Sequence, residues 1–186
     1  MMAMRLRLTV PTRPARDAVL AFLTGLEPSY GGPFADALTK LRDSSGNNVA
    51  IAFDDGGLLQ SLDAWANTML PVAYHAAEER HAAERRARGI LTALGRQPEE
   101  FIGRPASALS LYERRLAGFV RAMLVEPGLL VLDRLFEELG RDERQGITAC
   151  IELFGRRYPL RRMLYVGFAD VRLPDFEPLV PEEVVS

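Results

Sequence analysis

The sequence predicts an α/β fold with a mostly parallel sheet flanked by helices. Short apolar runs of strand length alternate along the chain with longer segments whose apolar residues recur at helical spacing. One run, at residues 129–133, is apolar up to its last residue, which is typical of a strand buried on both faces. Strands that alternate with helices favour right-handed crossovers between parallel neighbours.

The expected elements follow one another along 186 residues, of which 48% are hydrophobic and 26% charged, enough for one domain with a sizeable core. Prolines and glycines mark most ends of the expected strands and helices, because both residues interrupt regular structure. Strands are expected at 6–10, 49–53, 129–133 and 163–167, and helices at 15–26, 78–94, 110–125 and 137–154. A helical subdomain is expected from about residue 62, residues 33–48 carry mixed signals that end in a loop, and the tail at 174–186 is expected to be loose.

Charge and cysteine content exclude several classes of protein. The net charge is −2, so a nucleic-acid partner is not expected. One cysteine, Cys150, and two histidines, His75 and His81, are too few for an internal disulfide or a structural zinc site, and we expect no metal. The first residues lack the apolar centre of a signal peptide, and no stretch of 18 apolar residues occurs. A cytoplasmic protein without a membrane span is therefore expected.

Two adjoining segments carry a resemblance to a known family. Residues 108–115, ALSLYERR, and 120–133, VRAMLVEPGLLVLD, resemble the signature helix and the Walker B strand of ATP-binding-cassette ATPases. Residues 53–59, 65–67 and 70–75 are similar to the Q-loop region of cassettes from organic-solvent-tolerance and Mce-type lipid transporters. Residues 18–32 resemble the helix and turn after the phosphate loop. The resemblance spans about residues 5–170 in order.

The resemblance implies a P-loop NTPase-like fold with a helical subdomain, in which the family's N-terminal antiparallel strands are missing or truncated. The whole chain, 1–186, then forms one cassette-like domain. Within it, 1–53 is the first part of the α/β core, 54–125 the helical subdomain with the signature helix, 126–170 the Walker B part of the core, and 171–186 a loose tail.

The segment at the position of the phosphate loop departs from the family's pattern. Such a loop needs glycines whose backbone N–H groups approach the phosphates, a lysine on the phosphates and a hydroxyl on Mg²⁺. Residues 10–17 contain no glycine and two prolines, which lack N–H donors. Arg16 falls at the lysine position and Asp17 at the hydroxyl position, so we expect ordinary phosphate binding to be lost.

Other nucleotide-handling positions depart as well. Asp133, the carboxylate on the Mg²⁺ side in the family, is retained, and Ser110 opens the signature. The substituted positions are Asp54 for the Q-loop glutamine, Leu111, Tyr112 and Glu113 for the signature's two glycines and glutamine, Arg134 for the catalytic glutamate, Gly140 for the D-loop aspartate and Phe168 for the switch histidine. Because arginine cannot act as a base and phosphoryl transfer depends on positioned charge, we expect no ATPase activity.

Several of these residues have alternative interpretations. Arg134 is either a surface or ion-paired residue, with Glu137 or Glu138, or a cation that fills the vacant metal and phosphate space. Trp65 belongs either to the core or, as in the family, to the face near the groove that accepts a permease helix. The two histidines are expected to be solvated, and Cys150 lies on an apolar helical face with no nucleophile elbow in the chain.

The function expected from these residues is that of a catalytically inactive cassette homologue, a subunit or regulator of a lipid or organic-solvent-tolerance transport system that acts by protein binding. Its partners would be a permease, an active cassette subunit or a second copy, with the membrane reached only through a permease. No cofactor is expected. The alternatives are a subunit that still binds ATP and Mg²⁺ weakly in a heterodimer, or a diverged regulatory protein outside transport.

Overall fold

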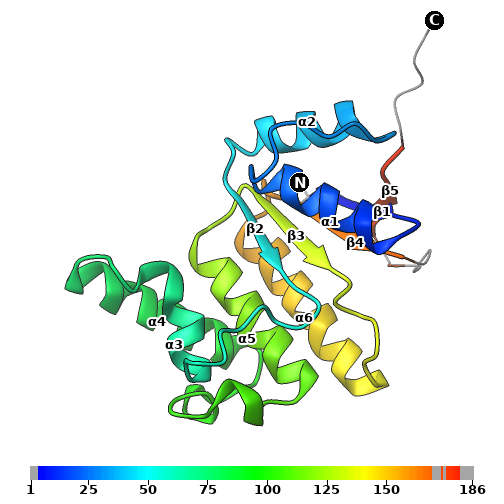
Figure 1. The fold of residues 1–186 in the computed structure, drawn as a ribbon. Helices are drawn as coiled ribbons and strands as arrows, with labels where there is room; N and C mark the ends of the chain where they lie inside the picture. The colour runs from blue at the N-terminus through cyan, green and yellow to red at the C-terminus, as the bar shows by residue number, and fades with distance from the viewer. Residues whose placement is uncertain (1–3, 169–172, 174, 181–186) are drawn as a thin grey trace, which may run out of the picture. The chain divides into compact units, whose positions relative to one another are not determined.

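The computed structural model describes residues 4–168, 173 and 175–180, which form two compact units (Figure 1). The first unit comprises the chain up to Ile51, Pro127–Arg134 and the part after Pro159. The second comprises Ala52–Glu126 and Leu135–Tyr158. The expected helical subdomain, 54–125, falls within the second unit, which also contains the last long helix.

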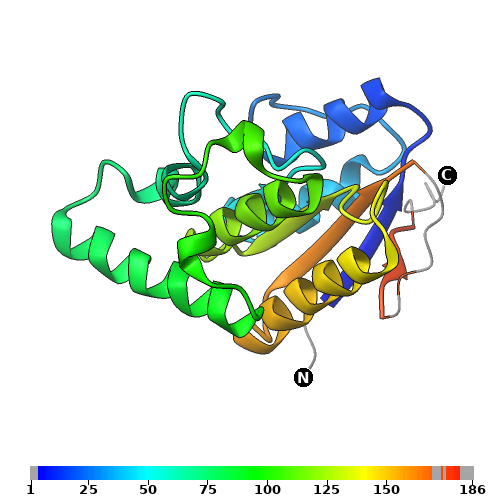
Figure 2. The same ribbon diagram turned by 90° about the horizontal axis from the view of Figure 1, so that it is seen from below.

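A sheet with the strand order β2-β3-β4-β1-β5 organises the first unit. Its strands are β1 (Met4–Thr9), β2 (Val49–Ala52), β3 (Leu129–Asp133), β4 (Arg162–Gly167) and β5 (Glu177–Pro178). The pairs β1–β4, β1–β5 and β3–β4 are parallel, and Figure 2 shows β1 and β4, in blue and orange, side by side. The register sets Thr9 opposite Gly167 and Asp133 opposite Val166, so the carboxyl ends of these strands share one edge of the sheet.

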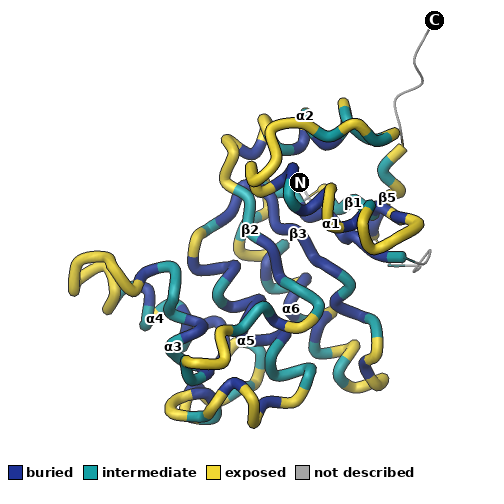
Figure 3. Tube along the Cα trace, viewed as in Figure 1, coloured by how far each residue is buried: buried dark blue, intermediate teal, exposed yellow. Residues whose placement is uncertain are grey.

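The four expected strands are confirmed within one or two residues at each end, and the bounds of β3 agree with the prediction. Every residue of β3 is buried, as the dark blue trace in Figure 3 shows. The tail departs from its expectation, because Glu177–Pro178 pair with β1 and the amide of Leu179 donates to the carbonyl of Arg7 at 2.7 Å. The proline is tolerated there because β5 is an edge strand. Residues 174 and 181–186 of the tail lie outside the described residues.

Two helices of the first unit are α1 (Arg13–Leu23) and α2 (Ala35–Ser44). The helix α1 begins two residues before the predicted start, because the hydroxyl of Thr12 caps its first turn. The helix α2 was not predicted; its buried face consists of Leu38 and Leu41, too few apolar residues for a clear periodicity. Arg42 of α2 lies over the ring of Phe22 at 4.1 Å and donates to the Phe22 carbonyl, which joins α2 to the end of α1.

The second unit is helical. Its elements are α3 (Ala64–Met69), α4 (Ala77–Ala93), α5 (Leu111–Leu124), α6 (Arg141–Arg157) and the short 3₁₀ helices η1 (Leu70–Val72), η2 (Pro98–Glu100) and η3 (Ala106–Ala108). The helix α5 contacts α3, α4 and α6 and buries most of its residues. The predicted helices at 78–94 and 110–125 are therefore confirmed.

The helix expected at 137–154 begins instead at Arg141. Glu138 adopts a positive φ of 62°, which a helix cannot accommodate. Gly140 then serves as the N-cap, and the Glu143 carboxylate accepts a hydrogen bond from the Gly140 amide at 2.9 Å. The backbone of Glu138 thus stops the helix from beginning earlier, and the Glu143 carboxylate caps its first turn.

The loop after β2 packs closely against the backbone of α5, at Gly56 and Gly118. A Cβ added at Gly118 would lie 2.5 Å from the carbonyl oxygen of Gly56. Gly56 itself has φ +85°, and a Cβ there would lie 2.3 Å from the Arg114 carbonyl oxygen. Arg121 reinforces the contact with hydrogen bonds to the carbonyls of Gly56 and Gly57 at 3.1 and 2.8 Å. Two stretches of backbone therefore meet here without intervening side chains.

Replacing Gly118 with alanine should destabilise the protein. The new methyl group would meet a fixed carbonyl, and overpacking of this kind costs about 1–3 kcal/mol of unfolding free energy. Gly89→Ala in α4 is the matched control, because nothing lies within 4 Å of its added Cβ and alanine favours an exposed helix by about 0.5–1 kcal/mol. Urea unfolding measures both variants. Equal stabilisation by the two substitutions would show that the loop does not rest on α5.

Candidate functional site

The segment at the phosphate-loop position uses its backbone donors within the chain. It follows β1, where the Val10 amide donates to the Gly167 carbonyl at 2.9 Å. The Ala15 amide donates to the hydroxyl of Thr12 at 3.3 Å, and the Arg16 amide to the Thr12 carbonyl at 3.1 Å. Pro11 and Pro14 contribute no N–H. Thr12 therefore accepts the hydrogen bonds that two of the amides at the start of α1 donate.

Arg16 and Asp133 form a buried bidentate ion pair at the carboxyl edge of the sheet. Nε of Arg16 lies 2.7 Å from Oδ1 of Asp133, and Nη2 bonds to Oδ2. Arg16 is 6% exposed and Asp133 is 0% exposed. The remaining terminal nitrogen of Arg16 contacts the carboxylate of Asp17 at 3.1 Å, where that side chain is 58% exposed. The structure thus brings together three predicted site residues, and both oxygens of Asp133 bond to a cation of the same chain.

Arg134 and Phe168 also meet, in a contact that the sequence analysis did not predict. The guanidinium lies over the Phe168 ring, 4.4 Å from its centre, and both side chains are half-buried. The Arg134 amide donates to the Val166 carbonyl at 2.9 Å, and its φ of 52° turns the chain at the end of β3. Neither side chain can accept a proton from water at ordinary pH. The pair therefore contributes packing where the resemblance assigns a base and a switch.

The signature segment in the second unit carries its own negative charge. Ser110 caps α5 by accepting from the Glu113 amide at 3.2 Å, and the Glu113 carboxylate accepts from the Ser110 amide at 2.8 Å. Arg104 donates to both oxygens of Glu113 at 2.7 and 2.9 Å. These hydrogen bonds from Arg104 hold the pKa of Glu113 below its usual value. An ionised carboxylate therefore occupies the first turn of this helix, where Arg104 neutralises it and the Arg96 guanidinium lies 3.5 Å away.

Tyr112 in the same segment packs against α6 instead of leaving space for a ligand. A Cβ added at Gly146 would lie 2.2 Å from the Tyr112 hydroxyl oxygen, so the ring rests directly on the α6 backbone. Burial raises the pKa of the Tyr112 hydroxyl. The residue that replaces a signature glycine thus stabilises a contact between α5 and α6.

Arg115 is a buried residue that the sequence analysis did not single out. The residue is 2% exposed, and its guanidinium donates to the carbonyl oxygens of Asp54, Leu135 and Glu137. It therefore joins the predicted Q-loop position, through the Asp54 backbone, to the segment that follows Arg134 in sequence. Its position in the sequence could have indicated burial, because Arg115 lies four residues before Phe119 and therefore on the same, buried face of α5.

The other expectations have mixed outcomes. His75 and His81 are exposed as expected, and Cys150 is buried in α6, where burial raises its pKa to about 12. Trp65 is half-buried with the Arg88 guanidinium 5.3 Å above its ring, so the core interpretation is only partly met.

Within the described residues, no cluster of three or more histidine, cysteine or acidic side chains is arranged to hold a metal, and no helix is long and apolar enough to cross a membrane.

Comparison with known proteins identifies the fold. No family model matches the chain. It is 30% identical over 140 residues to the methionine import ATP-binding protein MetN of Rhizobium meliloti (strain 1021), a match that covers 71% of this chain and 38% of the relative. The chain thus aligns with well under half of that protein.

Solved structures agree over most of the chain. A dimeric structure of MJ0796, described as a bacterial ABC transporter cassette, matches with a TM-score of 0.64 at 17% identity, covering 91% of this chain and 76% of that one. The protein cbiO1 from Clostridium perfringens, part of the ABC transporter complex cbiONQ, matches with a TM-score of 0.63 at 14% identity, covering 89% and 67%. The chain shares the fold of these cassette structures, an α/β fold whose parallel sheet is flanked by helices, which confirms the predicted fold class.

Breaking the buried ion pair should be costly, and removing both charges should not. Arg16→Met leaves the Asp133 carboxylate buried without its bidentate partner and should lower the unfolding free energy by about 3–5 kcal/mol. The double variant Arg16→Met/Asp133→Leu should recover most of this loss, because no buried charge remains. Denaturant unfolding of the single and double variants measures the coupling. A double variant that is less stable than Arg16→Met alone would contradict the pairing of Arg16 with Asp133.

Acid should remove the stabilisation that Glu113 contributes. Because the folded pKa of Glu113 lies below the unfolded value, its contribution is present above the ordinary pKa of 4.5 and is lost as the pH falls through the lower folded value. Glu113→Gln keeps the capping geometry and removes the charge. Wild type should therefore exceed the variant in stability at pH 7 and lose that advantage in acid. A difference that grows on acidification would contradict the assignment.

Proposed function

We propose that the chain is an inactive cassette homologue that acts by binding other proteins rather than by hydrolysing ATP. The observation that carries the proposal is the buried pair between Arg16 and Asp133. In the family, the corresponding residues serve the nucleotide phosphates and Mg²⁺. Here the cation and the carboxylate bond to each other, so a nucleotide and its metal must compete with an interaction inside the chain.

That competition supports weak or absent nucleotide binding. A nucleotide and its metal would have to displace a buried, bidentate interaction between two charged groups, and the affinity that they gain is reduced by the free energy lost when the pair opens. The capped start of α1 adds to this loss, because the amides of Ala15 and Arg16 already donate to Thr12.

The positions that would activate water support a loss of turnover. Arg134 and Phe168 contact each other and supply neither a base nor a proton carrier. The carboxylate of Glu113 stands where a partner subunit's phosphate would approach the signature helix. Positioned charge supplies most of the catalysis in phosphoryl transfer, so the combined changes should remove hydrolysis.

The partners proposed for the chain follow from its relatives. MetN is named as an import ATP-binding protein, and MJ0796 was solved as a dimeric transporter cassette. We assign to this chain a permease, an active cassette subunit or a second copy as partner, at the cytoplasmic face of a membrane reached through the permease. A lipid or organic-solvent-tolerance system is the transport class that the Q-loop resemblance favours.

ATP hydrolysis should be undetectable in the wild-type protein. The assay measures phosphate release from ATP in the presence of Mg²⁺ by the purified protein. The double variant Arg134→Glu/Phe168→His, which restores the family's base and switch residues, should also remain inactive because the Arg16–Asp133 pair is intact. Phosphate release by the purified wild type would overturn the proposal, and recovery in the double variant would limit the defect to those two residues.

A further inference from the structure

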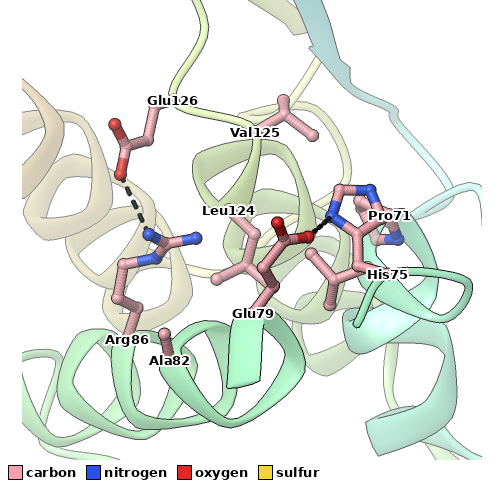
Figure 4. A pocket seen from close by; sticks show the side chains of 9 residues that line it. Pro71, His75, Glu79, Ala82, Arg86, Leu124, Val125 and Glu126 are labelled. Carbon is pink, nitrogen blue, oxygen red and sulfur yellow. Dashed lines mark ion pairs between the residues drawn. The ribbon is translucent and has the colours of Figure 1, made fainter. Parts of the chain in front are cut away.

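A hollow of about 540 Å³ opens in the second unit, and none of the residues assigned to the nucleotide site lines it. It is bounded by η1, the start of α4 and the end of α5 (Figure 4). Val72 and Leu124 are buried side chains that line it together with Pro71 and Ala82. Its lining therefore offers an apolar surface large enough for a small organic molecule.

Charged side chains stand at two places around this apolar surface. Nη1 of Arg86 lies 3.4 Å from Oε1 of Glu126, and Nδ1 of His75 lies 2.9 Å from Oε2 of Glu79. Figure 4 shows the Arg86 guanidinium with one terminal nitrogen toward Glu126 and the other directed toward the side of the hollow where Glu79 stands. The hollow thus combines an apolar lining with the Arg86–Glu126 ion pair and the His75–Glu79 contact.

Arg86 is the less satisfied of these charged groups. Its contact with Glu126 is long, and its Nε is buried with no hydrogen-bond partner. A guanidinium presents five N–H donors and binds a planar carboxylate through two of them. Glu79, in contrast, already has a close partner in His75. The guanidinium therefore keeps N–H donors for a further anionic acceptor beside Glu126.

The surrounding charges limit that acceptor to a single negative charge. Glu79 and Glu126 both line the hollow, so a dianionic phosphate would meet repulsion from two carboxylates. A monocarboxylate would share the guanidinium with Glu126 and place its hydrocarbon part against Val72 and Leu124. We propose that this hollow binds a small amphiphilic monocarboxylate, with Arg86 holding the carboxylate and the apolar lining holding its chain.

The proposal is tested with sodium hexanoate as the probe and the full chain in solution. Backbone amide shifts followed by NMR should locate the probe at Val72, Ala82 and Leu124. Arg86→Met should weaken binding about tenfold, as expected when a charged hydrogen-bonding partner is lost. Arg85→Met, a neighbouring exposed position on the same helix outside the hollow, is the matched control and should leave binding unchanged.

Glu126→Gln separates ligand binding from a purely structural ion pair. Removing its negative charge frees Arg86 and should strengthen hexanoate binding by about threefold or more. Hexylammonium and hexanol, which share the hydrocarbon chain, should bind more weakly than hexanoate. Three results would each overturn the proposal: no shifts at about 10 mM hexanoate, equal binding of hexylammonium, or shifts centred away from the hollow. Weaker hexanoate binding by Glu126→Gln would overturn it as well.

Discussion

A buried ion pair between the first turn of α1 and the last residue of β3 is the constraint on which the first unit's site depends. Arg16 and Asp133 are far apart in sequence and bond through two pairs of atoms at the carboxyl edge of a parallel sheet. This edge is where open α/β sheets bind their ligands. In this chain the Arg16 guanidinium occupies that edge and bonds to Asp133, where the resemblance places a nucleotide phosphate and a metal.

Other residues that the resemblance assigns to nucleotide chemistry also contact their own chain. Arg134 packs on Phe168, Glu113 bonds to Arg104 and Tyr112 rests on Gly146. The segment around Asp54 and Gly56 is tied to α5 by Arg115 and Arg121. Each contact is local to one unit, and in each a side chain that the resemblance assigns to nucleotide chemistry, or its neighbour in sequence, contacts the chain itself.

Local pattern predicted much of this fold, and long-range contacts account for what it missed. The strand β3 and the helix α5 have strong signals, a continuous apolar run and a capping box, and both were found. The helix α2 has only a narrow apolar face, and the start of α6 depends on the positive φ of Glu138. The resemblance marked Arg16 and Asp133 one by one, but their pairing requires the sheet register, which no local spacing encodes. Arg115 was missed because an arginine on a helix is ordinarily a solvated residue.

Calorimetric titration with ATP and with ADP, each with and without Mg²⁺, tests the central claim most directly. The titration must be able to detect a dissociation constant of about 1 mM, or roughly −4 kcal/mol. The account predicts no Mg²⁺-dependent heat of binding, because the cation and the carboxylate that would receive the nucleotide and its metal bond to each other. Mg²⁺-dependent binding of ATP that is lost in an Asp133→Asn variant would contradict it and would show that the pair opens to admit a nucleotide.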